Sequence, residues 1–233
     1  MISPNAGVSL TILRALPIFE MLDDESLKPL TRVAMLRQIP RHTVVLHDGD
    51  STDNIYFVLS GALKVQISDE EGREVILSML GPGELFGEMG VLDDHPRSAT
   101  VLAVEPSEVV VIGKADFKQC LVENPDVSLF IMRNLTKRLR LADRNIESLA
   151  LLDVYGRVAR LLLEAAETVD GRKVVTHKLT KQDIAKMIGA SREMVSRVMR
   201  DLLAQGLIQE RDGQLILVDL EAFKRHGDVD ATL

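Results

Sequence analysis

The stretch LTKQDIAKMIGASREMVSRVMRDLLAQGLI, residues 179–208, predicts two short helices joined by a tight turn. Thr180, followed three residues later by Asp183, forms a capped helix start, because each side chain can accept a hydrogen bond from the other residue's amide. Gly189 supplies the left-handed residue at which the first helix ends, and Ser191 caps the second helix. The apolar residues that we expect in the core are Ile184, Ala185, Met187 and Ile188, then Val195, Val198, Met199 and Leu202. This pattern is typical of a helix-turn-helix.

The outward face of the second helix carries polar residues near its start. Arg192 and Glu193 lie in the first turn and Arg197 lies one turn beyond Glu193, so the three can point outward together. A recognition helix places such side chains on base edges in the major groove, where arginine can bond guanine and glutamate can accept from cytosine. The alternative is a solvated helical hairpin with an ion pair between Glu193 and Arg197. The partner that we expect is double-stranded DNA. The candidate DNA-binding residues are Thr180, Lys181, Ser191, Arg192, Glu193, Ser196 and Arg197.

The segment after Leu152 completes this region. Residues 155–208 are expected to be helical, and Asp212-Gly213 between two apolar runs predicts a β-hairpin that would form a wing beside the two helices. Residues 226–233 are expected to be a frayed tail.

Charge is distributed unevenly in this chain, whose net charge is −7. Residues 1–154 contain 15 basic and 23 acidic residues, whereas residues 155–233 contain 13 and 12. Within residues 178–200 six basic side chains face only Asp183 and Glu193. DNA phosphates interact with the local charge of a protein surface and not with its net charge. An acidic protein with this basic segment can therefore still bind nucleic acid.

The composition is that of a globular protein without disulfide bonds. The 233 residues, 46% apolar and 27% charged, can bury one large or two modest cores. Cys120 is the single cysteine, so no intramolecular disulfide is possible, and no Cys/His spacing predicts a metal site. Neither a leader-like start nor a run of about 18 apolar residues is present, so we expect a cytoplasmic protein without a membrane partner.

Short β-rich runs dominate the first half of the chain. Residues 10–38 are expected to be helical, with Pro17 and Pro29 dividing them into short pieces. The β-rich runs that follow are 44–46, 55–59, 63–67, 75–77 and 109–112, separated by turn-forming residues. Leu63, Val65 and Ile67 alternate with polar residues, which predicts one solvated face for that strand. We expect a compact antiparallel roll or barrel.

The stretch GELFGEMGVLDDHPRSAT, residues 83–100, lies between the β-rich runs and is loop-like. Gly87 and Gly90 allow the backbone to approach a ligand closely, Arg97 offers a planar cation to a phosphate, and Ser98 adds a hydroxyl donor. A buried guanidinium without a counter-anion is costly, so a bound anion is the natural partner of Arg97.

An internal partner for this arginine is the alternative. Three acids lie in the same stretch and could neutralise Arg97, namely Glu84, Asp93 and Asp94.

Residues 125–152 return to a helical pattern with a narrow apolar stripe. The stripe consists of Leu135, Leu139, Ala142, Ile146 and Leu149, spaced 4, 3, 4, 3. Such a heptad seam favours pairing with the same helix of a second copy, and hence a homodimer, over packing on its own domain, which is the alternative.

Taken together, the roll, the 83–100 stretch, the heptad helix and the winged helix-turn-helix resemble, over about residues 10–220, the catabolite activator protein (Crp/Fnr) family of transcription regulators. The resemblance implies an α+β fold with a cyclic-nucleotide-binding β-roll at 1–124, a dimerisation helix at 125–153 and a winged helix-turn-helix domain at 154–233. It also implies a palindromic operator with half-sites similar to TGTGA, allosteric control by the nucleotide, and RNA polymerase as a further partner.

The resemblance also implies the residues that hold the effector, with Glu88 as acceptor for the ribose 2′-hydroxyl. The candidate effector-binding residues are Gly87, Glu88, Met89, Arg97, Ser98, Ala99, Ala142 and Asp143. Ala142 and Asp143 stand where nucleotide-activated members of the family present a Thr-Ser pair to the base. A carboxylate there suits the N1–H and amino group of guanine. Cyclic AMP is the first candidate effector, with Asp143 facing solvent, and cyclic GMP or cyclic di-GMP is the alternative.

Other functions are disfavoured. Cys120 alone cannot ligate an iron–sulfur cluster, and the histidines at 42, 47, 95, 177 and 226 show no haem or metal spacing. An enzyme acting on cyclic nucleotides would need metal ligands that the sequence lacks. A regulator that binds DNA independently of any ligand is the remaining alternative.

Overall fold

The computed structural model describes residues 8–175, 179–211 and 214–227. His177, Lys178, the Asp212-Gly213 turn and residues 228–233 of the expected tail lie outside the described residues. The chain divides into two compact units, Met1–Lys137 and Arg138–Leu233, and the long helix α5 (Pro125–Leu151) contributes to both. The domain boundaries expected after residues 124 and 153 stay predictions.

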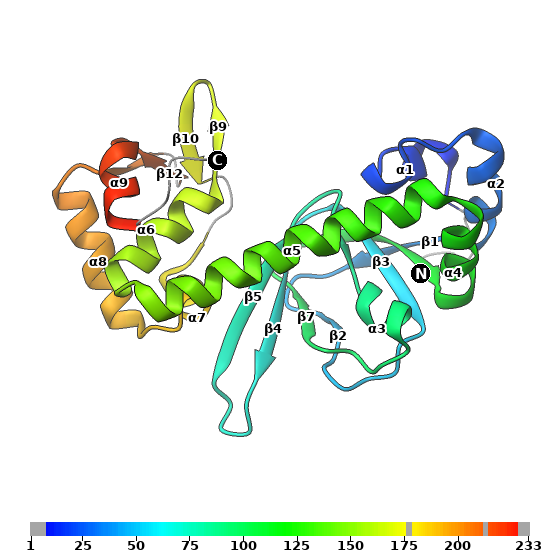
Figure 1. The fold of residues 1–233 in the computed structure, drawn as a ribbon, viewed down its shortest axis with the longest axis horizontal. Helices are drawn as coiled ribbons and strands as arrows, with labels where there is room; N and C mark the ends of the chain where they lie inside the picture. The colour runs from blue at the N-terminus through cyan, green and yellow to red at the C-terminus, as the bar shows by residue number, and fades with distance from the viewer. Residues whose placement is uncertain (1–7, 176–178, 212–213, 228–233) are drawn as a thin grey trace. The chain divides into compact units, whose positions relative to one another are not determined.

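Two four-stranded antiparallel sheets form the first unit (Figure 1). The strands of the first sheet follow the order β1-β8-β3-β6, and those of the second follow β2-β7-β4-β5. The strands are β1 (Met35–Ile39), β2 (Val44–Leu46), β3 (Asn54–Ser60), β4 (Leu63–Ser68), β5 (Glu74–Leu80), β6 (Leu85–Phe86), β7 (Thr100–Ala103) and β8 (Ser107–Gly113). The expected antiparallel roll is confirmed, and its strands include all five of the β-rich runs.

The central strands of the first sheet, β8 and β3, are buried on both faces. Tyr56 and Val58 of β3 pack between the two sheets, whereas Ile55 and Phe57 pack beneath a layer of helices. Those helices are α1 (Leu10–Arg14), a 3-10 turn (Pro17–Phe19), α2 (Asp24–Val33), α3 (Glu88–Asp93), α4 (Lys114–Glu123) and the start of α5. The roll therefore holds α3, which lies in the middle of the 83–100 stretch, against β3.

Two expectations for the N-terminal segment are wrong. Residues 35–38 are not helical, because Ala34 is extended and Met35–Ile39 pairs with β8 as an edge strand. Its first four residues are exposed, so the sequence offers no alternation of burial from which to predict a strand. Pro29 lies inside α2 instead of ending it, and Leu27 and Leu30 on either side are buried.

The solvated face expected for residues 63–67 is only partly correct. Leu63 is buried and Lys64 is half-buried, but Gln66 is 7% exposed and Ile67 is 37% exposed. The pairing of β4 with β5 shifts register between Val65 and Gln66. The extra residue of this bulge is Leu77 of β5, whereas β4 keeps a regular register with β7 through Gln66. The side-chain amide of the buried Gln66 donates to Glu74 at 2.8 Å.

The second unit packs helices on a small sheet. The helices are α6 (Val154–Ala165), α7 (Lys181–Ile188), α8 (Arg192–Ala204) and α9 (Leu220–Gly227), and the strands are β9 (Ala166–Val169), β10 (Arg172–Val175), β11 (Ile208–Arg211) and β12 (Gln214–Leu217). Strand order is β11-β12-β10-β9, and β11 and β12 pair antiparallel as the expected wing requires. All eight apolar residues expected in the helix-turn-helix belong to the core of this unit or pack against it.

The helical expectation for residues 166–175 is wrong. Asp170 and Gly171 both have positive φ, 48° and 74°, and connect β9 to β10 in a two-residue turn. An Asp-Gly pair is a hairpin signal, so this turn could have been predicted from the sequence. Within the described part of the chain, no helix is both long and apolar enough to cross a membrane.

Candidate functional sites

Arg97 is the buried centre of the first candidate site. It is 5% exposed, and its guanidinium donates from Nη1 to the Gly87 carbonyl and from Nη2 to the Asn54 carbonyl, both at 2.7 Å. The guanidinium carbon lies 5.9 Å from the ring centroid of Tyr56. The Nε atom is buried and makes no hydrogen bond within the described residues. Burial lowers the pKa of Arg97, and the nearby groups, first Tyr56 and then Asp53, oppose that shift. The cation is thus desolvated and its donors are not all used.

Two glycines allow this arrangement. Gly87 precedes α3 with φ +78°, and a Cβ atom at this position would lie 2.6 Å from Nη1 of Arg97. A Cβ atom on Gly90 would lie 2.4 Å from the Thr52 hydroxyl and 2.5 Å from the His95 carbonyl. At both glycines the close neighbours are other parts of the roll, and the predicted approach of the backbone to a ligand stays a prediction.

The structure contradicts neutralisation of Arg97 by the three nearby acids. Glu84 accepts from the Gly81 amide, Asp93 accepts from the His95 amide, and Asp94 pairs with Lys114 and Lys118. Within the described ranges, no carboxylate oxygen lies at ion-pair distance from the Arg97 guanidinium. A buried cation that lacks a counter-ion is an electrostatic site for an anion.

The other candidate effector residues differ in exposure. Glu88 is 2% exposed in the first turn of α3, Ala99 is buried, and Met89 is half-exposed. Ser98 is exposed, and its hydroxyl lies 3.8 Å from the Met89 sulfur. The structure therefore brings Gly87 and Arg97 into direct contact and leaves Ser98 accessible beside them.

Ala142 and Asp143 lie on the exposed surface of α5 in the second unit. Their role as base contacts stays a prediction.

The second candidate site is built on α7 and α8, whose predicted caps are confirmed. Thr180 accepts from the Asp183 amide at 3.1 Å, and Asp183 accepts from the Thr180 amide at 3.3 Å, which completes a capping box. Gly189 ends α7 with φ +62°, and the Ser191 hydroxyl accepts from the Met194 amide at 3.2 Å. Local hydrogen bonds thus determine where α8 starts and which side chains it presents.

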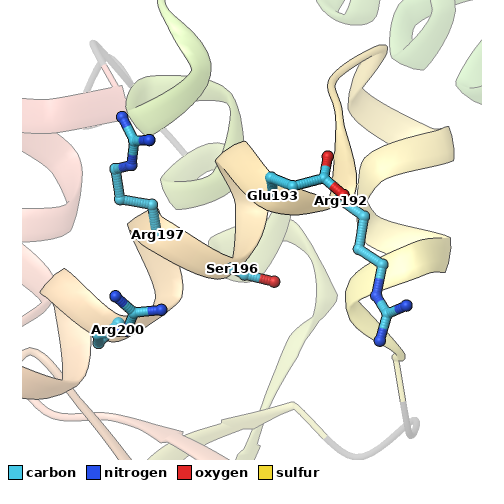
Figure 2. Close-up of a pocket in the computed structure, with 5 residues that line it drawn as sticks. All are labelled: Arg192, Glu193, Ser196, Arg197 and Arg200. Atoms are coloured by element: carbon cyan, nitrogen blue, oxygen red, sulfur yellow. The ribbon is translucent and has the colours of Figure 1, made fainter.

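The outward face of α8 forms a hollow of about 420 Å³ (Figure 2). Its lining residues are Arg192, Glu193, Ser196, Arg197 and Arg200. Ser196 is half-buried and the other four are exposed, as are Thr180, Lys181 and Ser191. The predicted outward set is therefore brought together on one helix face.

Glu193 is the one acid among the described residues that line this hollow. Hydrogen bonds from its own amide and from Ser191, with the charge of Arg192, lower the pKa of Glu193, so the carboxylate is ionised at neutral pH. The alternative ion pair between Glu193 and Arg197 is absent from the described part of the chain. Arg200 was not among the candidate residues, although its position four residues after Ser196 is a signal that it shares the face.

Comparison with known proteins identifies the domains in which both candidate sites lie. The cyclic nucleotide-binding domain matches residues 36–124, and the Crp-like helix-turn-helix domain matches residues 156–226. A CRP-like cAMP-activated global transcriptional regulator of Mycobacterium tuberculosis is 31% identical over 220 residues, which cover 93% of this chain and 98% of the relative. The cAMP-activated global transcriptional regulator CRP of Pasteurella multocida is 35% identical over 190 residues, which cover 78% of this chain and 89% of the relative.

Among solved structures, the c-di-GMP-responsive global regulator CLP of Xanthomonas campestris is 27% identical, with a TM-score of 0.68 over 84% of this chain and 100% of that chain. This chain carries both domains, and its alignment with the Mycobacterium tuberculosis relative spans 98% of that protein. The chain therefore belongs to the Crp/Fnr family: it is a cyclic-nucleotide-responsive, DNA-binding transcription regulator and not an enzyme.

Proposed function

We propose that this protein is a homodimeric regulator whose affinity for a palindromic operator is set by a cyclic nucleotide bound at Arg97. The observation that carries the proposal is the buried guanidinium of Arg97, which has no carboxylate partner among the described residues and an unused Nε donor. A cyclic phosphate would supply the missing negative charge. Ser98, exposed beside it, adds a hydroxyl donor.

The ribose and the base would use other residues. Glu88, in the first turn of α3, is the proposed acceptor for the ribose 2′-hydroxyl. The base would meet α5, where Ala142 and Asp143 stand. We place cyclic AMP first, because the relatives from Mycobacterium tuberculosis and Pasteurella multocida are named as cAMP-activated.

A guanine nucleotide is the second candidate effector. Asp143 is an exposed carboxylate, and a carboxylate can accept from both the N1–H and the amino group of guanine. The regulator from Xanthomonas campestris, described as c-di-GMP-responsive, adds support at 27% identity. Calorimetric titration with cyclic AMP, cyclic GMP and cyclic di-GMP separates the candidates. Asp143→Ala should then weaken a guanine ligand selectively. If cyclic AMP binds much more tightly than both guanine ligands, the guanine assignment is wrong, and if none binds, the effector site is wrong.

The apolar seam of α5 supports a homodimer. Leu139, Ile146 and Leu149 are 63%, 66% and 56% exposed, while Leu135 packs on the core of the first unit. A heptad stripe exposed to this extent is suited to a second copy of the same helix. Two-fold symmetry would present two α8 helices to successive major grooves about 34 Å apart.

The operator would then be an imperfect palindrome with half-sites similar to TGTGA. Arg192 and Arg197 would bond guanines, and Glu193, ionised at neutral pH, would accept from cytosine. RNA polymerase is the further partner that we propose from the family assignment, and the cytoplasm is the proposed compartment because the operator lies there.

A further inference from the structure

Arg200 lies on the outward face of α8 without an assigned role. Its side chain is exposed and lines the same hollow as Arg192, Glu193, Ser196 and Arg197 (Figure 2). Within the described segments, the Arg200 guanidinium forms no ion pair or hydrogen bond with another side chain. This guanidinium is therefore available to an external anion.

The charge of the hollow favours such an anion. Three of its five lining side chains are guanidinium groups and one, Glu193, is a carboxylate. Glu193 is occupied by hydrogen bonds from its own amide and from Ser191, near the start of the helix. At the position of Arg200, two turns further along, no acid lines the hollow to offset the positive charge.

The distance along the helix determines which part of DNA this charge can meet. Eight residues separate Arg192 from Arg200, which corresponds to about 12 Å of helix axis. The major groove is also about 12 Å wide. A recognition helix contacts base edges with its N-terminal residues, so a residue about 12 Å further along lies beyond the base edges. At that position the groove is bordered by the phosphates of the DNA backbone.

We propose that Arg200 is a phosphate-contacting residue that strengthens DNA binding without reading sequence. This inference rests on the proposed function, because it takes α8 to be the recognition helix. A guanidinium binds a phosphate with two parallel hydrogen bonds. Arg200 therefore supplies affinity and fixes the orientation of α8, whereas Arg192, Glu193 and Arg197 supply discrimination.

The test compares two duplexes and four substitutions in the full-length protein. One duplex carries two inverted TGTGA half-sites and the other carries the same bases in shuffled order. Affinities of wild type, Arg200→Gln and Arg200→Lys are measured by fluorescence anisotropy between about 50 and 200 mM salt, the range in which phosphate contacts dominate the change. Arg32→Gln is the matched control, because it removes one exposed positive charge from α2 in the other unit.

Arg200→Gln should weaken binding to both duplexes by the same factor, about 8-fold at 0.1 M salt for each protomer that contacts DNA. The plot of log affinity against log salt should become shallower by about 0.9 for each such protomer, hence about 1.8 for a dimer. Arg200→Lys should restore the slope, because a phosphate contact needs the charge, whereas the geometry of a guanine contact needs the fork. Arg32→Gln should change neither affinity nor slope, and Arg197→Ala should lose the preference for the operator instead.

Two results would overturn the assignment of Arg200. One is a loss confined to the operator duplex and not restored by lysine, which would make Arg200 a base-reading residue. The other is an unchanged affinity and salt slope on both duplexes. Failure of wild type to bind either duplex, both without nucleotide and with saturating cyclic AMP, cyclic GMP or cyclic di-GMP, would instead contradict the proposed function. Binding of wild type to both duplexes without preference would contradict the operator, and the salt slope would still test Arg200.

Discussion

Arg97 and Gly87 together shape the proposed effector site. Two backbone carbonyls hold the guanidinium of Arg97, and neither of them neutralises its charge. One of those carbonyls belongs to Gly87, whose missing side chain leaves the space that Nη1 occupies. The position of the cation therefore depends on the absence of a Cβ atom ten residues earlier in the chain.

Gly87→Ala should displace Arg97 and weaken nucleotide binding by more than about 10-fold, a value equivalent to one lost charge-assisted hydrogen bond. The new Cβ atom would lie 2.6 Å from Nη1, and the residue would keep a φ of +78° that disfavours alanine. Calorimetry gives the affinity, and thermal unfolding gives the stability.

Gly72→Ala is the matched control for this substitution. Gly72 has a φ of +77° in the turn between β4 and β5, and a Cβ atom there meets nothing within 4 Å. It therefore reproduces the backbone strain without the displaced arginine. An equal fall in nucleotide affinity in both variants would contradict the role given to Gly87.

Asp94 makes stability depend on pH at the end of α3. Hydrogen bonds from Lys114 and then from Lys118 lower the pKa of Asp94 from 3.8 to about 2. Because the folded pKa lies below the unfolded one, the contribution of Asp94 is present above about pH 4 and is lost as the pH falls toward 2. We expect Asp94→Asn to be less stable than wild type at pH 7 and to approach wild type below pH 4, as measured by urea unfolding.

Asp48→Asn serves as the control for Asp94, because Asp48 is exposed and has no ion pair within the described residues. Its substitution should leave the unfolding midpoint unchanged at both pH values. A difference between wild type and Asp94→Asn that increases in acid would be inconsistent with a lowered pKa.

Residue type and spacing were enough to predict part of each site. The caps at Thr180, Ser191 and Gly189 follow from local chemistry, and the structure has them as expected. The partners of Arg97 did not follow, because the carbonyls of Asn54 and Gly87 have no side-chain signature. They become partners only when β3 and the start of α3 meet in the roll.

Among the elements, the helix α5 is buried near its start and exposed further along. Its first turns bury Val127 and Ile131 in the core of the first unit, whereas Leu139, Ile146 and Leu149 are exposed. Near its end, Glu147 accepts from Arg160 of α6 at 3.0 Å. The exposed seam thus lies on the part of the helix that belongs with the DNA-binding unit.

Ile146→Glu should convert the dimer to a monomer, because the two-fold axis would place like charges in an apolar seam. We expect the dimer dissociation constant to rise by at least about 100-fold, since like-charge juxtaposition costs several kcal/mol. Sedimentation equilibrium measures the association, and circular dichroism checks that the helix content is retained.

Asn145→Glu is the control for the seam, because it adds the same charge to an exposed neighbour outside the heptad. This variant should stay dimeric. A wild type that is monomeric at micromolar concentration, or an Ile146→Glu variant that stays dimeric, would refute the seam as the dimer interface.

Strands were predicted best where both faces are buried. The β3 and β8 segments are continuous runs of apolar residues, and both form strands. In contrast, β1 has four exposed residues at the edge of a sheet, and only its pairing with β8 makes it a strand. The bulge opposite Val65 and Gln66 could not be predicted from the sequence either, because it arises from the pairing of β4 with β5.

In the whole molecule, nucleotide binding in one unit would be linked to DNA binding in the other. The proposed anion site lies in the first unit and α8 lies in the second, so any effect of the nucleotide on DNA binding is a coupling free energy. Coupling of binding is reciprocal, and operator DNA must therefore change the nucleotide affinity by the same factor as the nucleotide changes the operator affinity. Typical couplings are about 5- to 150-fold.

The most direct measurement is the fluorescence anisotropy of a labelled operator duplex, titrated with the protein alone and with saturating cyclic AMP, cyclic GMP or cyclic di-GMP. We expect at least one nucleotide to change the operator dissociation constant by about 5-fold or more, in either direction. We also expect that Arg97→Ala, while still folded and still able to bind DNA, shows no such change. An operator affinity that is the same with and without every nucleotide that the protein binds, or an unaltered response in Arg97→Ala, would contradict control of DNA binding by a nucleotide at Arg97.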